Sequence, residues 1–432
     1  MNNKPLNIKK IIVEICRVCL GLLFIFSGFV KAIDPWGTAI KNAEYLEAFG
    51  LGDLDFAAMP LGIIQIAIEF GLGVFLLMGI YRRFNTIFSL LFMLVMTPLT
   101  LYLAIKNPIT DCGCFGDALV ISNWATFYKN LFLLAAAVIV VLWHKQITPV
   151  FSHKSYNSAV LWTYVFILGF CWFTCTYLPI VDFRPYKIGA NIPSLMTVPE
   201  DAEHDVYETV LIYKKNGVEQ EFTLENYPKS DDTTWVFVDQ KSKLIKKGYE
   251  PPIHDFTITT ANEDDITEEV LSDTSYTFLL ISSKFKDASD VHVDRINALY
   301  DYSRKYGYRF YALTSSPNSE IAEWKSATGA EYPVCTTDET PLKTIIRSNP
   351  GLLLLKNGTI INKWPDANLP QQKLLDKPLV ESKLVIMPHS RPALKIFVAA
   401  LIFCIPMAVL YAIDVVKRRK RHSRKHSKGE KD

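Results

Sequence analysis

The sequence predicts a polytopic α-helical membrane protein that carries an α/β domain outside the membrane. Half of its 432 residues are hydrophobic and only 21% are charged, a more apolar balance than soluble domains show. Apolar runs long enough to cross a bilayer recur along the chain, and one long polar stretch, residues 182–395, separates the last two. This composition excludes a disordered chain and a general nucleic-acid binder.

Apolar runs of about 18 residues or more predict six transmembrane helices. Three of the runs tolerate ionisable residues: Glu14 and Arg17 in the first, Glu69 in the second, and Lys129 near one end of the fourth, where it can extend to the interface. We expect the first run to stay uncleaved, because no Ala-x-Ala-like site precedes Asp34. The predicted spans are residues 11–30, 60–80, 84–105, 124–143, 147–181 and 394–416.

The positions of basic residues predict the orientation of these helices. Lys and Arg gather before the first helix, after the second, after the fourth and after the sixth, where residues 417–432 hold nine of them against Glu430 and Asp432. Short basic loops stay in the cytoplasm. We therefore expect both termini to be cytoplasmic and residues 31–59, 106–123 and 182–395 to lie on the opposite side. The basic tail is interpreted as a topology anchor attracted to anionic lipid.

The polar stretch divides into two parts. Residues 182–272 are strand-like, with an Asn216-Gly217 turn signal. Residues 273–390 follow the order strand, helix, strand, helix, and then a hairpin that starts at Pro350, an order that resembles the thioredoxin fold. The resemblance implies a cis peptide before Pro350. The turn at residues 282–289, where thioredoxin-like enzymes carry their cysteines, contains no thiol, so the resemblance implies a fold and not an activity.

Cys112 and Cys114 form a Cys-Gly-Cys motif in the loop before the fourth helix. A single intervening glycine permits a tight, strained disulfide ring, and strain favours a labile bond over a structural one. On the extracytoplasmic side the pair is a candidate redox centre, accessible to soluble thiols and to lipophilic electron acceptors. A structural loop staple is the alternative. We expect no metal, because the nearby residues include carboxylates but no histidine.

Residues 8–146 resemble the DoxX/MauE-like family of small membrane proteins, which is associated with thiol redox functions. The resemblance rests on the segment 17–35, on Glu69, and on the segment 112–116. The predicted architecture is thus a four-helix DoxX-like bundle plus two further transmembrane helices and a thioredoxin-like extracytoplasmic domain. This layout resembles DoxX-family proteins of Bacteroidota-type bacteria, which implies a bacterial inner membrane and a periplasmic domain.

The ionisable residues inside the bundle form a second candidate site. Unpaired charges in a membrane are costly, so we expect an Arg17–Glu69 ion pair, with Glu14 one turn from Arg17 and Gln65 one turn from Glu69. Two interpretations remain open. The residues pin the helices together, or they provide a polar site for a quinone head group or a proton route.

The remaining cysteines are interpreted mainly as packing residues. Cys175, near the outer end of the fifth helix, is the candidate second thiol in a two-step relay with the Cys112–Cys114 pair, although buried filler is the more common role. Cys171 lies one turn away from it, and Cys335 lies in an apolar strand.

Two hypotheses about function follow. The first is a membrane thiol:disulfide oxidoreductase that acts through Cys112 and Cys114, with a quinone as the candidate cofactor and an extracytoplasmic thiol protein as the candidate client. The second is a non-enzymatic assembly or maturation factor that uses the thioredoxin-like domain as a binding module. A transporter ranks third because no inverted repeat is visible. The lipid bilayer is an expected partner and a nucleic acid is not.

Overall fold

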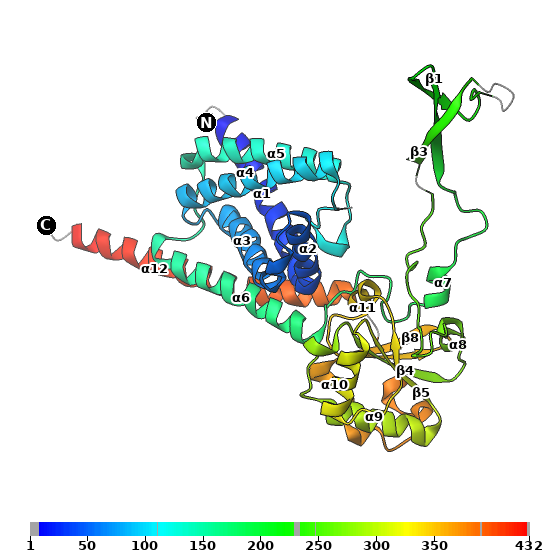
Figure 1. The fold of residues 1–432 in the computed structure, drawn as a ribbon. Helices are drawn as coiled ribbons and strands as arrows, with labels where there is room; N and C mark the ends of the chain where they lie inside the picture. The colour runs from blue at the N-terminus through cyan, green and yellow to red at the C-terminus, as the bar shows by residue number, and fades with distance from the viewer. Residues whose placement is uncertain (1–7, 110, 229–233, 247, 389–390, 430–432) are drawn as a thin grey trace.

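The computed structural model describes residues 8–109, 111–228, 234–246, 248–388 and 391–429. In this part of the chain, six helices are long and apolar enough to cross a membrane, as the sequence predicted. Figure 1 shows them gathered apart from a mixed α/β domain, which follows the end of α6. The six helices are α1 (Ile8–Ile33), α3 (Ala58–Met78), α4 (Arg82–Lys106), α5 (Asn123–Leu142), α6 (Tyr156–Tyr177) and α12 (Pro392–Gly429).

The helices α1 and α3 form a tight contact in the bundle. A Cβ atom on Gly28 would lie 2.7 Å from the backbone nitrogen of Phe70, so only glycine allows this backbone approach. Small residues commonly permit such close packing between membrane helices. The contact places the side chains of α1 directly against those of α3.

An additional helix, α2 (Pro35–Ala48), lies between α1 and α3 in the chain. The sequence pattern predicted only that this region lies in an extracytoplasmic segment. Asp34 caps α2 by accepting a hydrogen bond from Gly37 N at 3.0 Å, and Pro35 occupies the first turn. Both are ordinary helix-start signals. With 14 residues, α2 is too short to form the apolar run that predicts a membrane span.

The α/β domain contains a five-stranded sheet with the order β6-β5-β4-β7-β8. The central strand β4 pairs in parallel with β5 and antiparallel with β7, an arrangement that matches the predicted thioredoxin-like fold. The peptide bond between Asn349 and Pro350 is cis. The strands are β4 (Tyr276–Ser282), β5 (Arg309–Thr314), β6 (Val334–Thr336), β7 (Gly351–Lys356) and β8 (Thr359–Pro365), and the helices are α9 (Val293–Tyr306), α10 (Asn318–Thr328) and α11 (Glu339–Ile345).

The β-rich segment before this domain has two different parts. Its ends contain α7 (Ile192–Met196) and α8 (Thr267–Leu271), and residues such as Phe256 pack with Leu279 in one core of the five-stranded sheet. The middle part forms a separate antiparallel sheet, which projects away from the rest of the domain (Figure 1). Its strands, in the order β2-β1-β3, are β1 (Val206–Lys215), β2 (Val218–Thr223) and β3 (Val236–Lys246). The predicted boundary at residue 272 therefore does not separate two cores.

Short 3₁₀ helices complete the structure. They are η1 (Gly52–Ala57), η2 (Gly116–Ala118), η3 (His144–Gln146), η4 (His153–Ser155), η5 (Phe285–Asp287), η6 (Asp366–Asn368), η7 (Gln372–Leu374), η8 (Leu379–Glu381) and η9 (Lys383–Val385).

The loops group at two ends of the bundle. At one end, Asp414 of α12 accepts hydrogen bonds from Ser152 N at 2.9 Å and from Arg418 Nε at 2.7 Å. This end carries the basic loops, and α12 continues through the basic segment to Gly429, while residues 430–432 of the predicted tail lie outside the described residues. At the other end, Asp34 at the start of α2 and Asp117 in the loop after Cys114 both contact Arg347 of the α/β domain.

Candidate functional site

The Cys-Gly-Cys loop lies between α4 and α5 and holds its two sulfur atoms close together. The Sγ atoms of Cys112 and Cys114 are 2.8 Å apart, and both residues are buried. Gly113 has a left-handed backbone (φ +61°), and its N–H donates to Asp111 Oδ1 at 2.9 Å. A Cβ atom on Gly113 would lie 2.7 Å from Lys41 Cγ. The turn that brings the sulfurs together therefore requires glycine.

Side chains from α1 and α2 fix this loop to the bundle. Tyr45 OH donates to the carbonyl oxygen of Cys112 at 2.9 Å, and Ser27 Oγ lies 2.7 Å from the carbonyl oxygen of Cys114. Lys41 Nζ lies 3.2 Å from a carboxylate oxygen of Asp111. The cysteine pair is thus held against the helix bundle on both sides of Gly113.

The two thiols have opposite acid–base properties. A hydrogen bond from the Cys114 thiol lowers the pKa of Cys112 to about 6 against the effect of burial, and Thr126 and Lys129 act in the same direction. The pKa of Cys114 is raised because its proton is held in that hydrogen bond and its sulfur is buried. The lower pKa makes Cys112 the member of the pair that more readily forms a thiolate, the nucleophilic state of a thiol.

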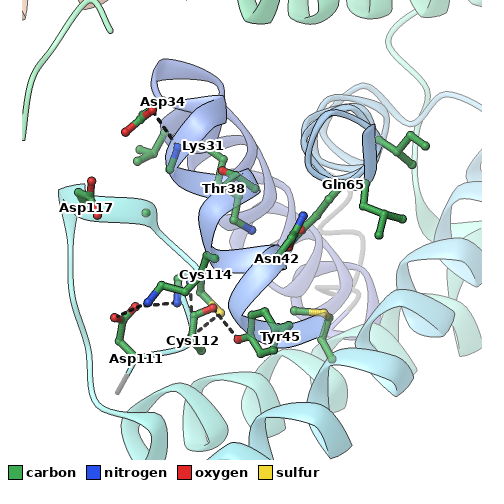
Figure 2. A pocket seen from close by; sticks show the side chains of 18 of the residues that line it. Lys31, Asp34, Thr38, Asn42, Tyr45, Gln65, Asp111, Cys112, Cys114 and Asp117 are labelled. Carbon is green, nitrogen blue, oxygen red and sulfur yellow. Dashed lines mark hydrogen bonds and ion pairs between the residues drawn. The ribbon is translucent and has the colours of Figure 1, made fainter. Parts of the chain in front are cut away.

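A cavity of about 400 Å³ opens beside the sulfurs. Both cysteines line it, together with Lys31 and Gln65, which extend toward it from neighbouring helices (Figure 2). Leu61, Ile64, Ile68, Phe92, Met96 and Leu99 supply an apolar wall from α3 and α4. Pockets of this size, with an apolar lining and a few polar groups, are typical of small-molecule sites.

One polar atom in this cavity has no partner. Thr38 Oγ1 is buried, lines the cavity and makes no hydrogen bond within the described part of the chain. Buried hydroxyls are normally paired with protein or water. The Thr38 hydroxyl is therefore an unpaired polar group in the wall of the cavity.

The predicted Arg17–Glu69 ion pair is wrong. Arg17 donates to Glu14 Oε2 at 2.8 Å and to the carbonyl oxygens of Leu76 and Leu77 in the last turn of α3. These carbonyls lie about two helical turns beyond Glu69, roughly 10 Å along the axis. Arg17 therefore binds two carbonyl oxygens in the last turn of α3 and, as expected, also pairs with Glu14.

Glu69 pairs instead with Lys31, a residue that the sequence analysis did not select. Lys31 Nζ lies 2.6 Å from Glu69 Oε1, and both side chains are only 3% exposed. Gln65 Nε2 donates to the same oxygen at 3.0 Å, and Ser27 Oγ lies 2.6 Å from Oε2. Lys31 lies four residues after Ser27, so both side chains occupy the same face of α1. This spacing is the feature of the sequence that could have indicated Lys31 as part of the polar site.

The other cysteines lie apart from this pair. Cys171 is buried in the core between α3, α6 and α12, and Cys335 is buried in β6. Cys175 is partly buried in α6 and is not among the residues that line the cavity. Within the described residues, no disulfide or hydrogen bond joins it to Cys112 or Cys114. A relay through Cys175 stays a prediction.

The thioredoxin-like domain meets the bundle at its cysteine-free turn. Ser283 and Asn349, which flank the turn and the cis proline, line a cavity of about 200 Å³ together with Trp36, Ile40 and Met59. Arg347 Nε lies 2.9 Å from Asp34 Oδ2 at the start of α2. The edge that carries the chemistry in thioredoxin-like enzymes here contacts α2.

The segment that links α6 to this domain covers the larger cavity. Pro179, Val181, Phe183 and Arg184 line it. Asp182 attaches the segment to β8 through an ion pair with Lys363 at 2.9 Å. It also forms an ion pair with Arg184 of the same segment at 2.8 Å. Lys363 and Arg184 hold the pKa of Asp182 at about 2, below its usual range, against its burial. We name residues 179–184 the roof segment.

Comparison with known protein families finds a match in the bundle. Residues 9–143, which span α1 to α5, match the family described as methylamine utilisation protein MauE, so the N-terminal region is MauE-like. Residues 207–247, which contain the projecting sheet, match a domain of unknown function (DUF8463). No curated protein matches the chain.

A solved structure resembles part of the α/β domain. It is a solution structure described as "a putative protein disulfide isomerase from Bacteroides thetaiotaomicron", with 16% identity and a TM-score of 0.23, and the match covers 26% of this chain and 76% of that chain.

Among the described residues, no group of three or more His, Cys, Asp or Glu side chains is placed to hold a metal ion.

Proposed function

We propose that this protein is a membrane thiol–disulfide oxidoreductase whose Cys112–Cys114 pair cycles between a dithiol and a disulfide. The observation that carries the proposal is the position of the two sulfurs, 2.8 Å apart at the wall of a largely apolar cavity. In our proposal the basic loops are cytoplasmic, the membrane is a bacterial inner membrane, and the pair faces the periplasm.

The two cysteines have different roles in this proposal. Cys112, whose pKa of about 6 leaves it mainly as thiolate at neutral pH, attacks one sulfur of a disulfide in a periplasmic client protein. The client's disulfide bond breaks, one client thiolate leaves, and a mixed disulfide with Cys112 forms. Cys114 then attacks Cys112 Sγ and releases the second client thiolate. Two electrons pass from the pair to the client, and the reverse sequence oxidises a client dithiol.

A quinone fits the cavity beside the pair better than it fits the site that the sequence suggested. The cavity has an apolar wall, and the polar residues Lys31, Gln65 and Thr38 are among those that line it. The space at Glu69 is only about 30 Å³, and Arg17 lines neither cavity. A bound quinone would accept two electrons and two protons from the dithiol. Lys31 and Gln65 would hold its polar groups.

Quinone reduction by the purified protein tests the redox proposal. We expect a soluble dithiol to reduce a short-chain ubiquinone analogue in the presence of the protein, with the loss of quinone absorbance as the readout. Changing Cys112 to Ser should abolish this activity, while changing Cys335 to Ser should leave it unchanged. Activity that survives the loss of Cys112 contradicts the proposal.

A second candidate function rests on the thioredoxin-like domain. Its turn at residues 282–289 carries serines where redox enzymes of this fold carry cysteines, which favours a non-enzymatic assembly or maturation factor anchored by the bundle. The exposed projecting sheet would then be available for binding. Full cellular function after changing both Cys112 and Cys114 to Ser would favour this candidate over the first.

A further inference from the structure

A buried polar cluster contacts Cys114, and two of its members, Ser27 and Glu69, have no role in the redox cycle proposed above. The cluster comprises Ser27, Lys31, Gln65 and Glu69. Lys31 and Glu69 are each only 3% exposed, so the membrane bundle holds a charged pair almost out of contact with solvent. Such pairs in membrane helices are costly to maintain and commonly mark functional sites.

The two oxygens of Glu69 have different surroundings. Oε1 receives Lys31 Nζ at 2.6 Å and Gln65 Nε2 at 3.0 Å, which suits a negative charge. Oε2 lies 2.6 Å from Ser27 Oγ, and the same hydroxyl lies 2.7 Å from the carbonyl oxygen of Cys114. A serine hydroxyl has one hydrogen and cannot donate to both of these acceptors.

A proton on Glu69 Oε2 satisfies both contacts. The carboxylic acid then donates to Ser27 Oγ, and Ser27 donates to the Cys114 carbonyl oxygen. The ionised carboxylate leaves one of the two short contacts without a hydrogen. The site therefore accommodates both states of Glu69, with Oε1 stabilising the ionised state and Oε2 the protonated one.

A small second cavity connects this cluster to Cys114. It measures about 30 Å³, and Ser27, Lys31, Glu69 and Cys114 all line it, along with Lys129. A space of this size with several polar groups is large enough for one water molecule. A single water there can pass a proton between the Cys114 thiol and Glu69.

We propose that Glu69 accepts the proton of Cys114 when that thiol attacks the mixed disulfide on Cys112, an inference that rests on the proposed redox function. The Cys114 S–H bond breaks, the proton moves through the small cavity to Glu69 Oε2, and the Cys114 sulfur bonds to Cys112 Sγ. The electron pair of the broken mixed disulfide leaves with the client thiolate. In the reverse direction Glu69 returns the proton to Cys114. Lys31 and Gln65 position the carboxylate, and Ser27 holds it in its protonated form.

The two steps of the reaction can be separated with one aromatic disulfide, 5,5′-dithiobis(2-nitrobenzoate), added at one equivalent to the full-length protein in detergent. The protein retains Cys112 and Cys114, and its other cysteines are changed to Ala. Attack by Cys112 releases one coloured thiolate, and closure of the Cys112–Cys114 disulfide releases a second. We expect Glu69→Gln to leave the first release within about twofold and to slow the second by about 100-fold, a typical contribution of a proton-transferring side chain.

Three further variants sharpen the test. Glu69→Asp keeps a carboxylate and should restore much of the second rate. Ser27→Ala keeps the Lys31–Glu69 pair and should slow only the second release, which gives an independent result if Glu69→Gln does not fold. Glu14→Gln removes the carboxylate that pairs with Arg17 instead and should change neither release.

The outcomes separate this inference from the proposed function. A second release as fast in Glu69→Gln as in the unaltered protein overturns the proton-accepting role, and so does an equal slowing of both releases, because a purely structural ion pair would affect both. Failure of the unaltered Cys112–Cys114 protein to release the first thiolate would instead contradict the redox function itself.

Discussion

Arg347 of the α/β domain and Asp34 of the helix bundle form an ion pair, with Arg347 Nε 2.9 Å from Asp34 Oδ2 and a second contact of 3.2 Å to Oδ1. Both side chains are largely buried, at 7% and 14% exposure. Asp34 is also the N-cap of α2, and Arg347 lies three residues before the cis proline. The contact therefore joins the helix bundle to the edge of the thioredoxin-like fold.

Removing Arg347 should loosen this contact. Deleting one partner of a buried ion pair leaves an uncompensated charge and typically costs about 3–5 kcal/mol. We expect Arg347→Ala to increase the labelling rate of Cys112 by a bulky maleimide several-fold, measured in a protein whose other cysteines except Cys114 are replaced. Arg304→Ala is the matched control, because its pair with Glu331 is exposed and worth little. Equal labelling rates in both variants and in the parent would show that the α/β domain does not restrict access to the pair.

The reactivity of Cys112 should depend on pH in a way that Cys114 controls. The hydrogen bond from the Cys114 thiol is the main cause of the lowered pKa of Cys112, about 6, and a thiol becomes reactive as the pH rises through its pKa. In the reduced protein, alkylation by iodoacetamide should thus reach half of its maximal rate near pH 6. In Cys114→Ala the midpoint should rise toward the ordinary thiol value, so the rate at pH 6.5 should fall by more than about tenfold.

The control in this experiment is Cys114→Ser, because a hydroxyl can still donate to Cys112. Its midpoint should lie between those of the parent and the Ala variant. An unchanged midpoint in Cys114→Ala would mean that Lys129 and Thr126, and not Cys114, determine the thiolate.

Two glycines in the loop allow a matched test of its geometry. Gly113 and Gly116 both have positive φ, so alanine at either position carries a backbone strain of about 1–2 kcal/mol. Only at Gly113 would the new Cβ clash, 2.7 Å from Lys41 Cγ, whereas at Gly116 the nearest atom is 4.0 Å away. We expect Gly113→Ala to slow disulfide formation by at least about tenfold, measured by gel-shift trapping, and Gly116→Ala to have a small effect. Similar rates in the two variants would contradict the proposed role of the Gly113 turn.

The parts of the fold that depend on local pattern were predictable from the sequence. The six spans follow from uninterrupted apolar runs, and the thioredoxin-like order of elements follows from strand and helix periodicity with a proline before the hairpin. The Cys-Gly-Cys turn was identified because its geometry depends on three consecutive residues. Each of these features is determined by residues that are close together in the sequence.

The partners across the bundle were not predictable in the same way. The sequence suggested an Arg17–Glu69 ion pair because both residues are ionisable and lie in adjacent helices. The position of each residue along the bundle axis, however, depends on how α1 and α3 pack. The close approach at Gly28 sets that position and places Lys31, not Arg17, beside Glu69. The helix α2 is too short to produce the apolar run of a membrane span, and only Asp34 and Pro35, a helix start signal, indicate it in the sequence.

The most direct test of the central claim is the redox state of Cys112 and Cys114 in intact membranes, measured by trapping free thiols with a maleimide of defined mass. The account predicts that the pair shifts to the disulfide form when an oxidised quinone or a disulfide is added and returns to the dithiol form when a reductant is added. A pair that stays in one state under every donor and acceptor would contradict the account.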